Sequence, residues 1–301
     1  MTSDQYRAQF DADITFANGG GLQAQGFRLD IPGPEISDAE LAELFVAHLG
    51  LLMVADVRLS ARSVIREAHK GSRGIGGGPV GGRRLVELSH PIEHGMTTYA
   101  GLPGPEISDH LSREASRSVY AEGVEFQIGR ITMVANTGTY LDTPAHRYPT
   151  GVDLAGVPLE RVADLDALVV RVPPEVTAID RLLLTPYDVA GRAVLVHTGW
   201  DRHWRTPAYG PGGHPHLTED AATLVAERGA ALVGIDSVNI DDTTGGTRPA
   251  HSVLLAHGIP VVEHLCRLED LPAHGFRFHA APPMVAGMGT FPVRAYAVIT
   301  A

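Results

Sequence analysis

Four side chains that can carry chemistry lie within one short stretch of the chain. Residues 136–146 read Asn-Thr-Gly-Thr-Tyr-Leu-Asp-Thr-Pro-Ala-His, which places an amide, a phenol, a carboxylate and an imidazole close together. The imidazole of His146 can accept or give a proton. Tyr140 and Asn136 can donate hydrogen bonds to a substrate oxygen that gains negative charge. The pattern predicts acid/base chemistry on a carbonyl compound, with Asp142 orienting His146.

The same stretch resembles a motif of the cyclase family, which includes bacterial kynurenine formamidase and isatin hydrolase. In that family the motif runs His-x-Gly-Thr-His-x-Asp-x-Pro-x-His. Five of its seven defining residues are kept in this chain: Gly138, Thr139, Asp142, Pro144 and His146. The first and second histidines are replaced by Asn136 and Tyr140. The chain therefore resembles the family and departs from it at two of the residues that hold the family's metal.

Further blocks of resemblance follow in the family's order and cover about residues 85–301. They are residues 88–92, 197–200, 233–241, 251–255, 261–265, 282–284 and 292–295. The resemblance implies an α/β fold, a mixed-sheet domain of the swivelling β/β/α type. It also implies a homodimer or homotetramer that acts on a small-molecule substrate.

The resemblance implies which residues would hold a metal. In the family, two histidines and the aspartate of the first motif, with a later histidine and glutamate, bind one or two divalent ions. Those positions here are Asn136, Tyr140, Asp142, His251 and Glu263. An amide oxygen is a weak ligand, and a phenol with a pKa of about 10 ligates only after losing its proton. Asp142, His251 and Glu263 remain, so we expect either no ion or a single Mn²⁺ or Zn²⁺. The resemblance makes His146 the general acid/base.

Three functions follow from these residues. In the leading one, Tyr140 and Asn136 donate to a substrate carbonyl and His146 is the base, oriented by Asp142 or Glu263. Such a set suits ring closure or rearrangement by aldol or dehydration chemistry, and family members are associated with polyketide antibiotic biosynthesis. The alternative is metal-dependent hydrolysis of an amide, lactam or lactone. The third is a small-molecule binding protein without catalysis.

Other candidates for contact with substrate are aromatic or imidazole side chains. The resemblance places His90, His94 and Tyr99 in a loop over the site, and Trp200 could form an aromatic wall with its neighbours. Taken singly, each such residue is more often packing or surface than chemistry.

The bulk composition limits the classes of protein. The chain has 301 residues, is 44% hydrophobic and 20% charged, and carries a formal net charge of −11. An acidic chain without a basic stripe disfavours nucleic acid as a partner. No apolar stretch approaches the ~20 residues that span a membrane, and the N-terminus lacks a signal-peptide pattern. With its single cysteine, Cys266, the chain suits a reducing cytoplasm.

Three segments are expected to position these residues. Residues 1–70 predict a small α+β extension: a hairpin over 10–31, a helix that begins with a Ser37/Glu40 capping box, and a further strand from residue 51. Residues 71–84 form a glycine-rich linker. Residues 85–301 form the family domain. Its expected strands are residues 85–88, 131–134, 167–172, 193–197 and 231–235, and its expected helices are residues 218–229 and 251–257.

Overall fold

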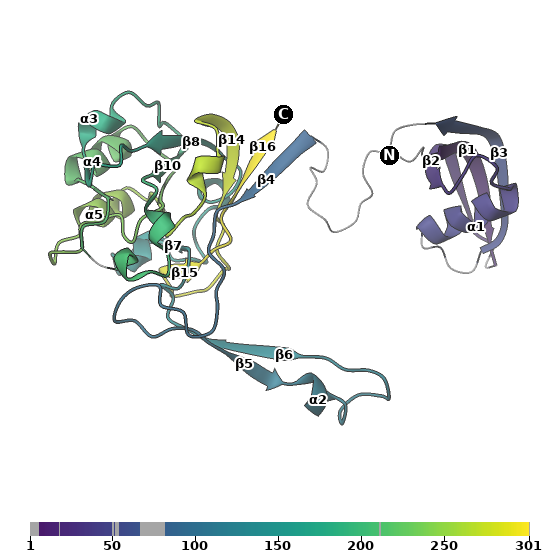
Figure 1. Ribbon diagram of the computed structural model, residues 1–301, viewed down its shortest axis with the longest axis horizontal. Coiled ribbons are helices and arrows are strands. Elements are labelled where there is room, and N and C mark those ends of the chain that lie inside the picture. Colours follow the sequence, from purple (N-terminus) through teal and green to yellow (C-terminus); the bar gives the residue numbers. More distant parts are fainter. Residues whose placement is uncertain are drawn as a thin grey trace. The chain divides into compact units, whose positions relative to one another are not determined.

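The computed structural model describes residues 6–17, 19–49, 51, 54–66, 82–210 and 212–300. The chain divides into two compact units, Met1–Gly78 and Pro79–Ala301 (Figure 1). We call them the N-terminal unit and the C-terminal unit and describe each by itself. Most of the predicted linker, residues 71–81, lies outside the described residues, as do residues 67–70. No helix among the described residues is long and apolar enough to cross a membrane.

The N-terminal unit is a three-stranded antiparallel sheet with one helix. Its strands β1 (Tyr6–Phe16), β2 (Gly21–Ile31) and β3 (Val54–Arg66) pair in the order β2-β1-β3. The helix α1 (Asp38–Leu49) buries Phe45 against Phe10 of β1, with ring centroids 5.1 Å apart. The predicted hairpin and helix are confirmed. At the helix start Ser37 N donates to Glu40 Oε2 over 2.9 Å, and Glu40 N donates to Ser37 Oγ over 3.3 Å.

The C-terminal unit contains a nine-stranded mixed sheet, so the predicted mixed α/β fold is confirmed. The strand order is β15-β7-β13-β12-β10-β8-β14-β16-β4. The bounds are β4 (Arg83–Glu87), β7 (Tyr140–Asp142), β8 (Leu165–Arg171), β10 (Ala193–His197), β12 (Leu232–Ile235), β13 (Val261–Glu263), β14 (His274–His279), β15 (Thr290–Pro292) and β16 (Tyr296–Thr300). The neighbours β8, β10, β12 and β13 are parallel, and the remaining pairs are antiparallel.

Both faces of the central strands are covered, as the continuous apolar runs at β8 and β10 predict. One core cluster joins alternate residues of these strands to three helices: α3 (Arg181–Leu184), α4 (Glu219–Glu227) and α5 (Pro249–Ala256). The other cluster, on the opposite face, includes Leu141, Leu195 and Phe278. A short parallel pair, β9 (Ala178–Ile179) with β11 (His216–Leu217), lies outside the main sheet.

One predicted strand pairs differently from the others. The segment expected at 131–134 is β6 (Ile128–Thr132), which forms a separate hairpin with β5 (Glu106–Leu111) around the short helix α2 (Arg113–Ser116). All five residues of β6 are exposed, whereas β8 and β10 are almost wholly buried. The β-branched pattern indicated a strand correctly, but it does not encode which sheet the strand joins.

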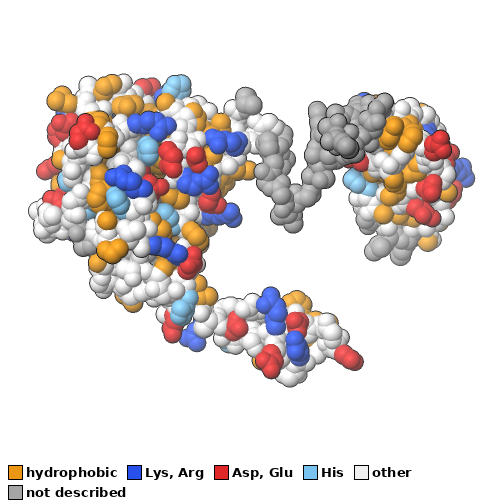
Figure 2. All heavy atoms as spheres, in the orientation of Figure 1, with side chains coloured by type: hydrophobic (Ala, Val, Ile, Leu, Met, Phe, Trp, Pro, Cys, Tyr) orange, Lys and Arg blue, Asp and Glu red, His pale blue; other side chains and the backbone are white. Residues whose placement is uncertain are grey.

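Short 3₁₀ turns complete the connections: η2 (Pro144–His146), η3 (Leu159–Arg161), η4 (Trp200–His203), η5 (Pro207–Tyr209) and η6 (Leu268–Asp270). Figure 2 shows acidic and basic side chains intermixed over the face of the C-terminal unit that it presents.

Candidate active site

Neighbouring strands bring three of the candidate residues together. In β7, Tyr140 and Asp142 are two residues apart and therefore point to the same face. The antiparallel partner β13 places Glu263 opposite Tyr140, and β15 on the other side places Thr290 opposite Asp142. The turn η2 directly after β7 brings His146 back over this group. The site thus forms where β7 is flanked on both sides.

The helix α5 contributes His251 and holds its ring in one orientation. Its first backbone amides, Ala250 N and His251 N, donate to the carboxylate of Asp241 over 2.6 and 3.1 Å. The same carboxylate accepts a hydrogen bond from His251 Nδ1 over 2.7 Å. When His251 is neutral with its proton on Nδ1, the lone pair of Nε2 faces the interior of the site. A carboxylate that orients a histidine in this way is a common arrangement behind metal ligands.

Two buried atoms at the centre lack a hydrogen-bond partner within the described part of the chain. They are Asp142 Oδ2 and His251 Nε2, which lie 3.4 Å apart. Glu263 Oε1 lies 3.5 Å from the same nitrogen. Unpaired polar atoms are costly to bury, and a carboxylate facing an imidazole lone pair leaves a place for a cation. The donor set therefore fits a divalent ion of the Mn²⁺ or Zn²⁺ type.

The electrostatics favour positive charge at this position. Burial lowers the pKa of His251, but Glu263, Asp142 and Asp241 outweigh burial and raise that pKa to about 10. Burial also raises the pKa of Glu263, and Asp142 adds to this rise while His251 opposes it. The buried carboxylates thus attract a cation, whether that cation is a proton on His251 or a metal ion.

The most compact group of potential metal ligands differs in one member from the predicted set. Ligand atoms of Asp142, His146 and His251 all lie within 4.8 Å of one another. Glu263, predicted as a ligand, already accepts hydrogen bonds on both oxygens, from Ile240 N over 2.6 Å and from the Tyr140 hydroxyl over 2.7 Å. A carboxylate oxygen has a second lone pair, so Glu263 Oε1 can still approach an ion.

In this structure Tyr140 donates a hydrogen bond to Glu263. The phenol is buried, and its hydroxyl donates to Glu263 Oε2. Burial raises the pKa of Tyr140 well above 10, and the charges of Glu263 and Asp142 raise it further. The phenol therefore keeps its proton and is a donor rather than a ligand. The sequence predicted that this donor serves a substrate carbonyl, and to do so it would have to leave Glu263.

Thr290 is a site residue that the sequence analysis missed. Its hydroxyl donates to Asp142 Oδ1 and lies 2.7 Å from His146 Nδ1. Because the hydroxyl has one proton and gives it to the carboxylate, it accepts a hydrogen bond from Nδ1–H of His146. Nε2 of His146 then carries a lone pair and can accept a proton. Thr290 lies 144 residues from His146 in the chain, so no local pattern indicates the contact.

Gly289 permits this approach. A side-chain carbon at Gly289 would lie 2.2 Å from His146 N and 2.5 Å from His146 Cα, far inside van der Waals contact. The strand β15 can therefore lie against η2 only because residue 289 has no side chain.

The site opens into two adjoining cavities. The smaller, of about 130 Å³, is lined by Asn136, Tyr140, His146, Arg147, Asn239, Arg248, His251 and Glu263. The larger, of about 370 Å³, shares Asn136, Tyr140 and Asn239 with it and adds Tyr99 and residues 100–102. The predicted residues Asn136 and Tyr99 are thus cavity-lining residues. A small polar chamber leading to a wider one suits a reacting group attached to a larger body.

The other predicted contact residues lie elsewhere. His90 stacks on Trp204 with ring centroids 4.0 Å apart, and burial lowers its pKa to about 4. His94 Nδ1 accepts a hydrogen bond from Ile107 N and borders a separate cavity. Trp200 packs edge-on against His203. The described structure brings none of these three to the two cavities at Tyr140.

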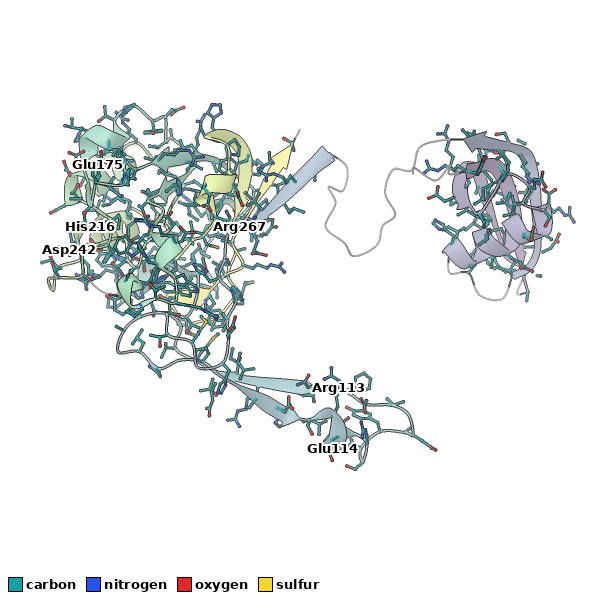
Figure 3. The ribbon with its side chains drawn as sticks, viewed as in Figure 1. Arg113, Glu114, Glu175, His216, Asp242 and Arg267 are labelled. Atoms are coloured by element: carbon teal, nitrogen blue, oxygen red, sulfur yellow. The ribbon has the colours of Figure 1, made fainter. Side chains whose placement is uncertain are left out.

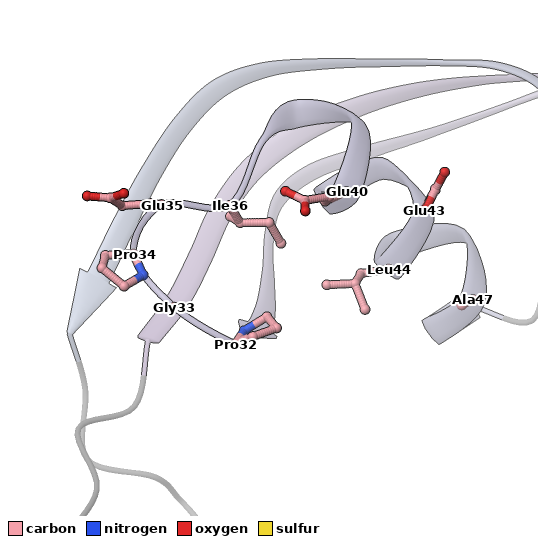
Figure 4. A pocket seen from close by; sticks show the side chains of 9 residues that line it. All are labelled: Pro32, Gly33, Pro34, Glu35, Ile36, Glu40, Glu43, Leu44 and Ala47. Carbon is pink, nitrogen blue, oxygen red and sulfur yellow. The ribbon is translucent and has the colours of Figure 1, made fainter.

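A more spacious hollow lies in the N-terminal unit and has no acid/base pair. It measures about 830 Å³ and lies between residues 32–36 and the helix α1 (Figure 4). Its ionisable side chains are three glutamates, of which Glu40 is already held by Ser37. Volume alone therefore does not locate the chemistry in this protein.

Comparison with known proteins agrees with the motif at Asp142 and His146. Residues 86–242, more than half of the chain, match the family model described as "Putative cyclase". The chain belongs to the cyclase family. Among the curated relatives of this cyclase-family protein, kynurenine formamidase of Bacillus cereus is 26% identical over 217 residues, covering 70% of this chain and 95% of the relative. The resemblance predicted from the motif is confirmed.

Solved structures show the same fold. Isatin hydrolase A from Labrenzia aggregata superposes with a TM-score of 0.62 at 21% identity, covering 73% of this chain and 95% of that chain. A potential metal-dependent hydrolase with cyclase activity superposes with a TM-score of 0.60 at 23% identity, covering 73% and 99%. At such identities the likeness establishes the fold alone.

Proposed function

We propose that this cyclase-family protein is a metal-dependent hydrolase that cleaves the C–N bond of an amide or cyclic amide. One observation carries the proposal. Asp142 Oδ2 and His251 Nε2 are buried, lack a hydrogen-bond partner among the described residues and face each other across 3.4 Å, while Nδ1 of the same imidazole is bonded to Asp241. The names of the relatives, kynurenine formamidase and isatin hydrolase A, support the same reaction.

Asp142 and His251 would hold the ion, with Glu263 or His146 as the next nearest donor. A divalent ion held there would polarise a carbonyl and would lower the pKa of water. His146 Nε2 takes the proton of the attacking water and returns it to the leaving nitrogen, since Thr290 holds its other nitrogen. The water oxygen joins the carbonyl carbon, the C–N bond breaks, and the nitrogen leaves as an amine.

The two replaced histidines take supporting roles in this scheme. Asn136 lines both cavities and can donate its amide N–H to the substrate oxygen. Tyr140 fixes Glu263 beside His251. Ring closure, the leading function predicted from the sequence, has less support, because it needs the Tyr140 hydroxyl to face the substrate and that hydroxyl is donated to Glu263.

The test joins metal content to turnover. The purified full-length protein is dialysed against chelator, reloaded with Mn²⁺ or Zn²⁺, and assayed by elemental analysis and by hydrolysis of formanilide and isatin. For the wild type we expect one ion per chain and hydrolysis of at least one of the two compounds. Asp142→Asn should lose both the ion and the hydrolysis. Asp166→Asn, at a half-exposed aspartate paired with Arg192, is the matched control. Hydrolysis that survives complete metal removal would refute the proposal.

A further inference from the structure

Two arginines border the smaller cavity at its outer end. Arg147 follows His146 directly, and Arg248 immediately precedes the helix α5 that carries His251. The loop that leads to Arg248 begins near Asp242, which Figure 3 labels at the surface of the C-terminal unit. Both guanidinium groups therefore belong to elements that also deliver a residue of the proposed reaction. Neither position was singled out from the sequence.

Hydrogen bonds to neutral groups hold each arginine in place. Arg147 Nε lies 3.4 Å from Ser252 Oγ, and its guanidinium carbon lies 5.3 Å from the ring centroid of Tyr148. Arg248 NH1 donates to three carbonyl oxygens of its own loop, the nearest being those of Thr247 at 2.7 Å and Gly245 at 2.8 Å. Ser252 also donates to the carbonyl of Arg248 over 2.6 Å, so one residue of α5 connects both arginines.

Neither arginine has a carboxylate partner within 4.0 Å in the described parts of the chain. Several other arginines of the same unit do form such pairs, for example Arg277 with Asp164 and Arg294 with Glu87. A guanidinium offers five N–H donors in a planar fork, and the printed contacts of Arg147 and Arg248 use only part of them. Both residues line the smaller cavity.

The charges of the inner site do not account for the two arginines. The acidic groups Asp142, Asp241 and Glu263 surround His251, and a divalent ion at that place would offset two of their three negative charges. None of these carboxylates forms an ion pair with Arg147 or Arg248 in the described structure, so the two positive charges at the cavity wall have no direct protein counterpart there. A guanidinium pair is well suited to a carboxylate, which it can bind through two parallel hydrogen bonds.

The simpler interpretation is structural, with Arg248 as a clamp for its loop. Arg228 offers a direct comparison, because its NH1 likewise donates to two carbonyl oxygens, those of Thr185 and Tyr187. Arg228 lines neither cavity at the site. A structural role and a ligand-binding role can therefore be separated. The contacts to carbonyl oxygens stabilise the loops at both Arg248 and Arg228, but only Arg248 and Arg147 can contribute to a preference for a charged ligand.

We propose that the substrate of this site carries a carboxylate, which Arg147 and Arg248 bind at the outer end of the smaller cavity. This inference rests on the proposed function for the chemistry performed there, while the anion subsite has its own test. It narrows the substrate class to amide acids, with the carboxylate a few bonds from the cleaved C–N bond. The uncharged body of such a molecule extends into the adjoining cavity at Tyr99 and Asn136.

The test compares two probes that differ in one charge, 2-aminobenzoate and 2-aminobenzamide, by calorimetric titration of the metal-loaded protein. We expect the wild type to bind the benzoate at least about tenfold more tightly than the benzamide. In the double variant Arg147→Gln/Arg248→Gln the preference should fall below about threefold. Arg228→Gln, which loses a similar clamp, should keep the wild-type preference. Equal affinities in the wild type, or an unchanged preference in the double variant, would overturn the proposal.

Two further measurements separate the remaining explanations. If Arg248→Gln does not fold, Arg147→Gln alone leaves the loop clamp intact and should still reduce the preference at least about threefold. A preference that disappears in Asp142→Asn and persists in the arginine variants would place the carboxylate on the ion and refute the subsite. Hydrolysis of 2-formamidobenzoate, which carries both an amide and a carboxylate, is followed in parallel. Its absence beside an arginine-dependent preference would refute the proposed reaction alone, and its presence without any preference would refute the subsite alone.

Discussion

The two units of this protein bury different kinds of residue. In the described N-terminal unit the buried side chains form one apolar cluster around Phe10, Leu41 and Phe45. The C-terminal unit buries apolar clusters as well, but it also buries charged groups, among them Asp142, His251 and Glu263. Burying charge costs free energy that apolar packing does not. A unit that buries a group of carboxylates beside an imidazole nitrogen without a hydrogen-bond partner in the described structure is therefore the one in which to seek the chemistry.

The largest expected effect comes from removing one of the buried charges. In Asp142→Asn the proposed ion loses a charged ligand, and we expect turnover to fall about 10³-fold, which corresponds to about 4 kcal/mol of transition-state stabilisation. Elemental analysis should show loss of metal, while circular dichroism should show a retained fold. A variant that keeps both metal and turnover would remove the contrast between the two units.

The second prediction separates a proton carrier from a metal ligand. His146→Ala should reduce turnover 10²- to 10⁴-fold, as is typical for loss of a general acid/base, and should leave metal content unchanged. Steady-state kinetics and elemental analysis on the same sample provide the two readings. Metal content below half of the wild-type value would instead place His146 among the ligands, as the compact group with Asp142 and His251 allows.

The third prediction concerns the apolar unit. Phe45→Ala removes a fully buried ring that contacts Phe10 and Phe27, and we expect the N-terminal unit to lose about 3–5 kcal/mol of stability. Hydrogen exchange of residues 6–49 should accelerate, whereas formanilide hydrolysis and metal content should not change. Leu44→Ala, at an exposed position of the same helix, is the control. Loss of turnover would mean that the two units depend on each other.

Metal removal should destabilise the C-terminal unit and leave the N-terminal unit unchanged. An ion that binds only the folded state stabilises it by about 2.7 kcal/mol at a free concentration one hundred times the dissociation constant. Chelation should therefore lower the stability of the C-terminal unit, measured by hydrogen exchange around α5 and β13, without changing exchange in the N-terminal unit. Equal protection around Asp241 and Glu263 with and without the metal would contradict an ion between these elements.

The smallest expected effect is that of Tyr140→Phe. This change removes the Tyr140 hydroxyl, which donates to Glu263 Oε2 over 2.7 Å. Partners that orient metal ligands typically contribute 10- to 100-fold in metal affinity or activity. Metal affinity should therefore fall about tenfold. Tyr209→Phe removes another buried hydroxyl, one bonded to His264, and should leave metal affinity unchanged. If Tyr140→Phe abolished turnover while metal affinity stayed the same, the phenol would act on the substrate, as ring closure requires.

Local sequence determined much of this protein. The kept residues Asp142, Pro144 and His146 identify the family, because their spacing is carried by a single short segment. The apolar runs at β8 and β10 predict strands buried on both faces, and the Ser37/Glu40 pair predicts where α1 begins. In each case the interacting groups are a few residues apart, so their pattern is visible without the fold.

Tertiary structure decided what these residues do. The pairing of β7 with β13 places Tyr140 on Glu263, and the pairing of β7 with β15 places Thr290 between Asp142 and His146. The partners are separated by more than 100 residues, and only strand register brings them within hydrogen-bonding distance. Register depends on the packing of the whole sheet. The sequence by itself therefore identified the family and most of the candidate residues, and the fold decided which of them contact one another.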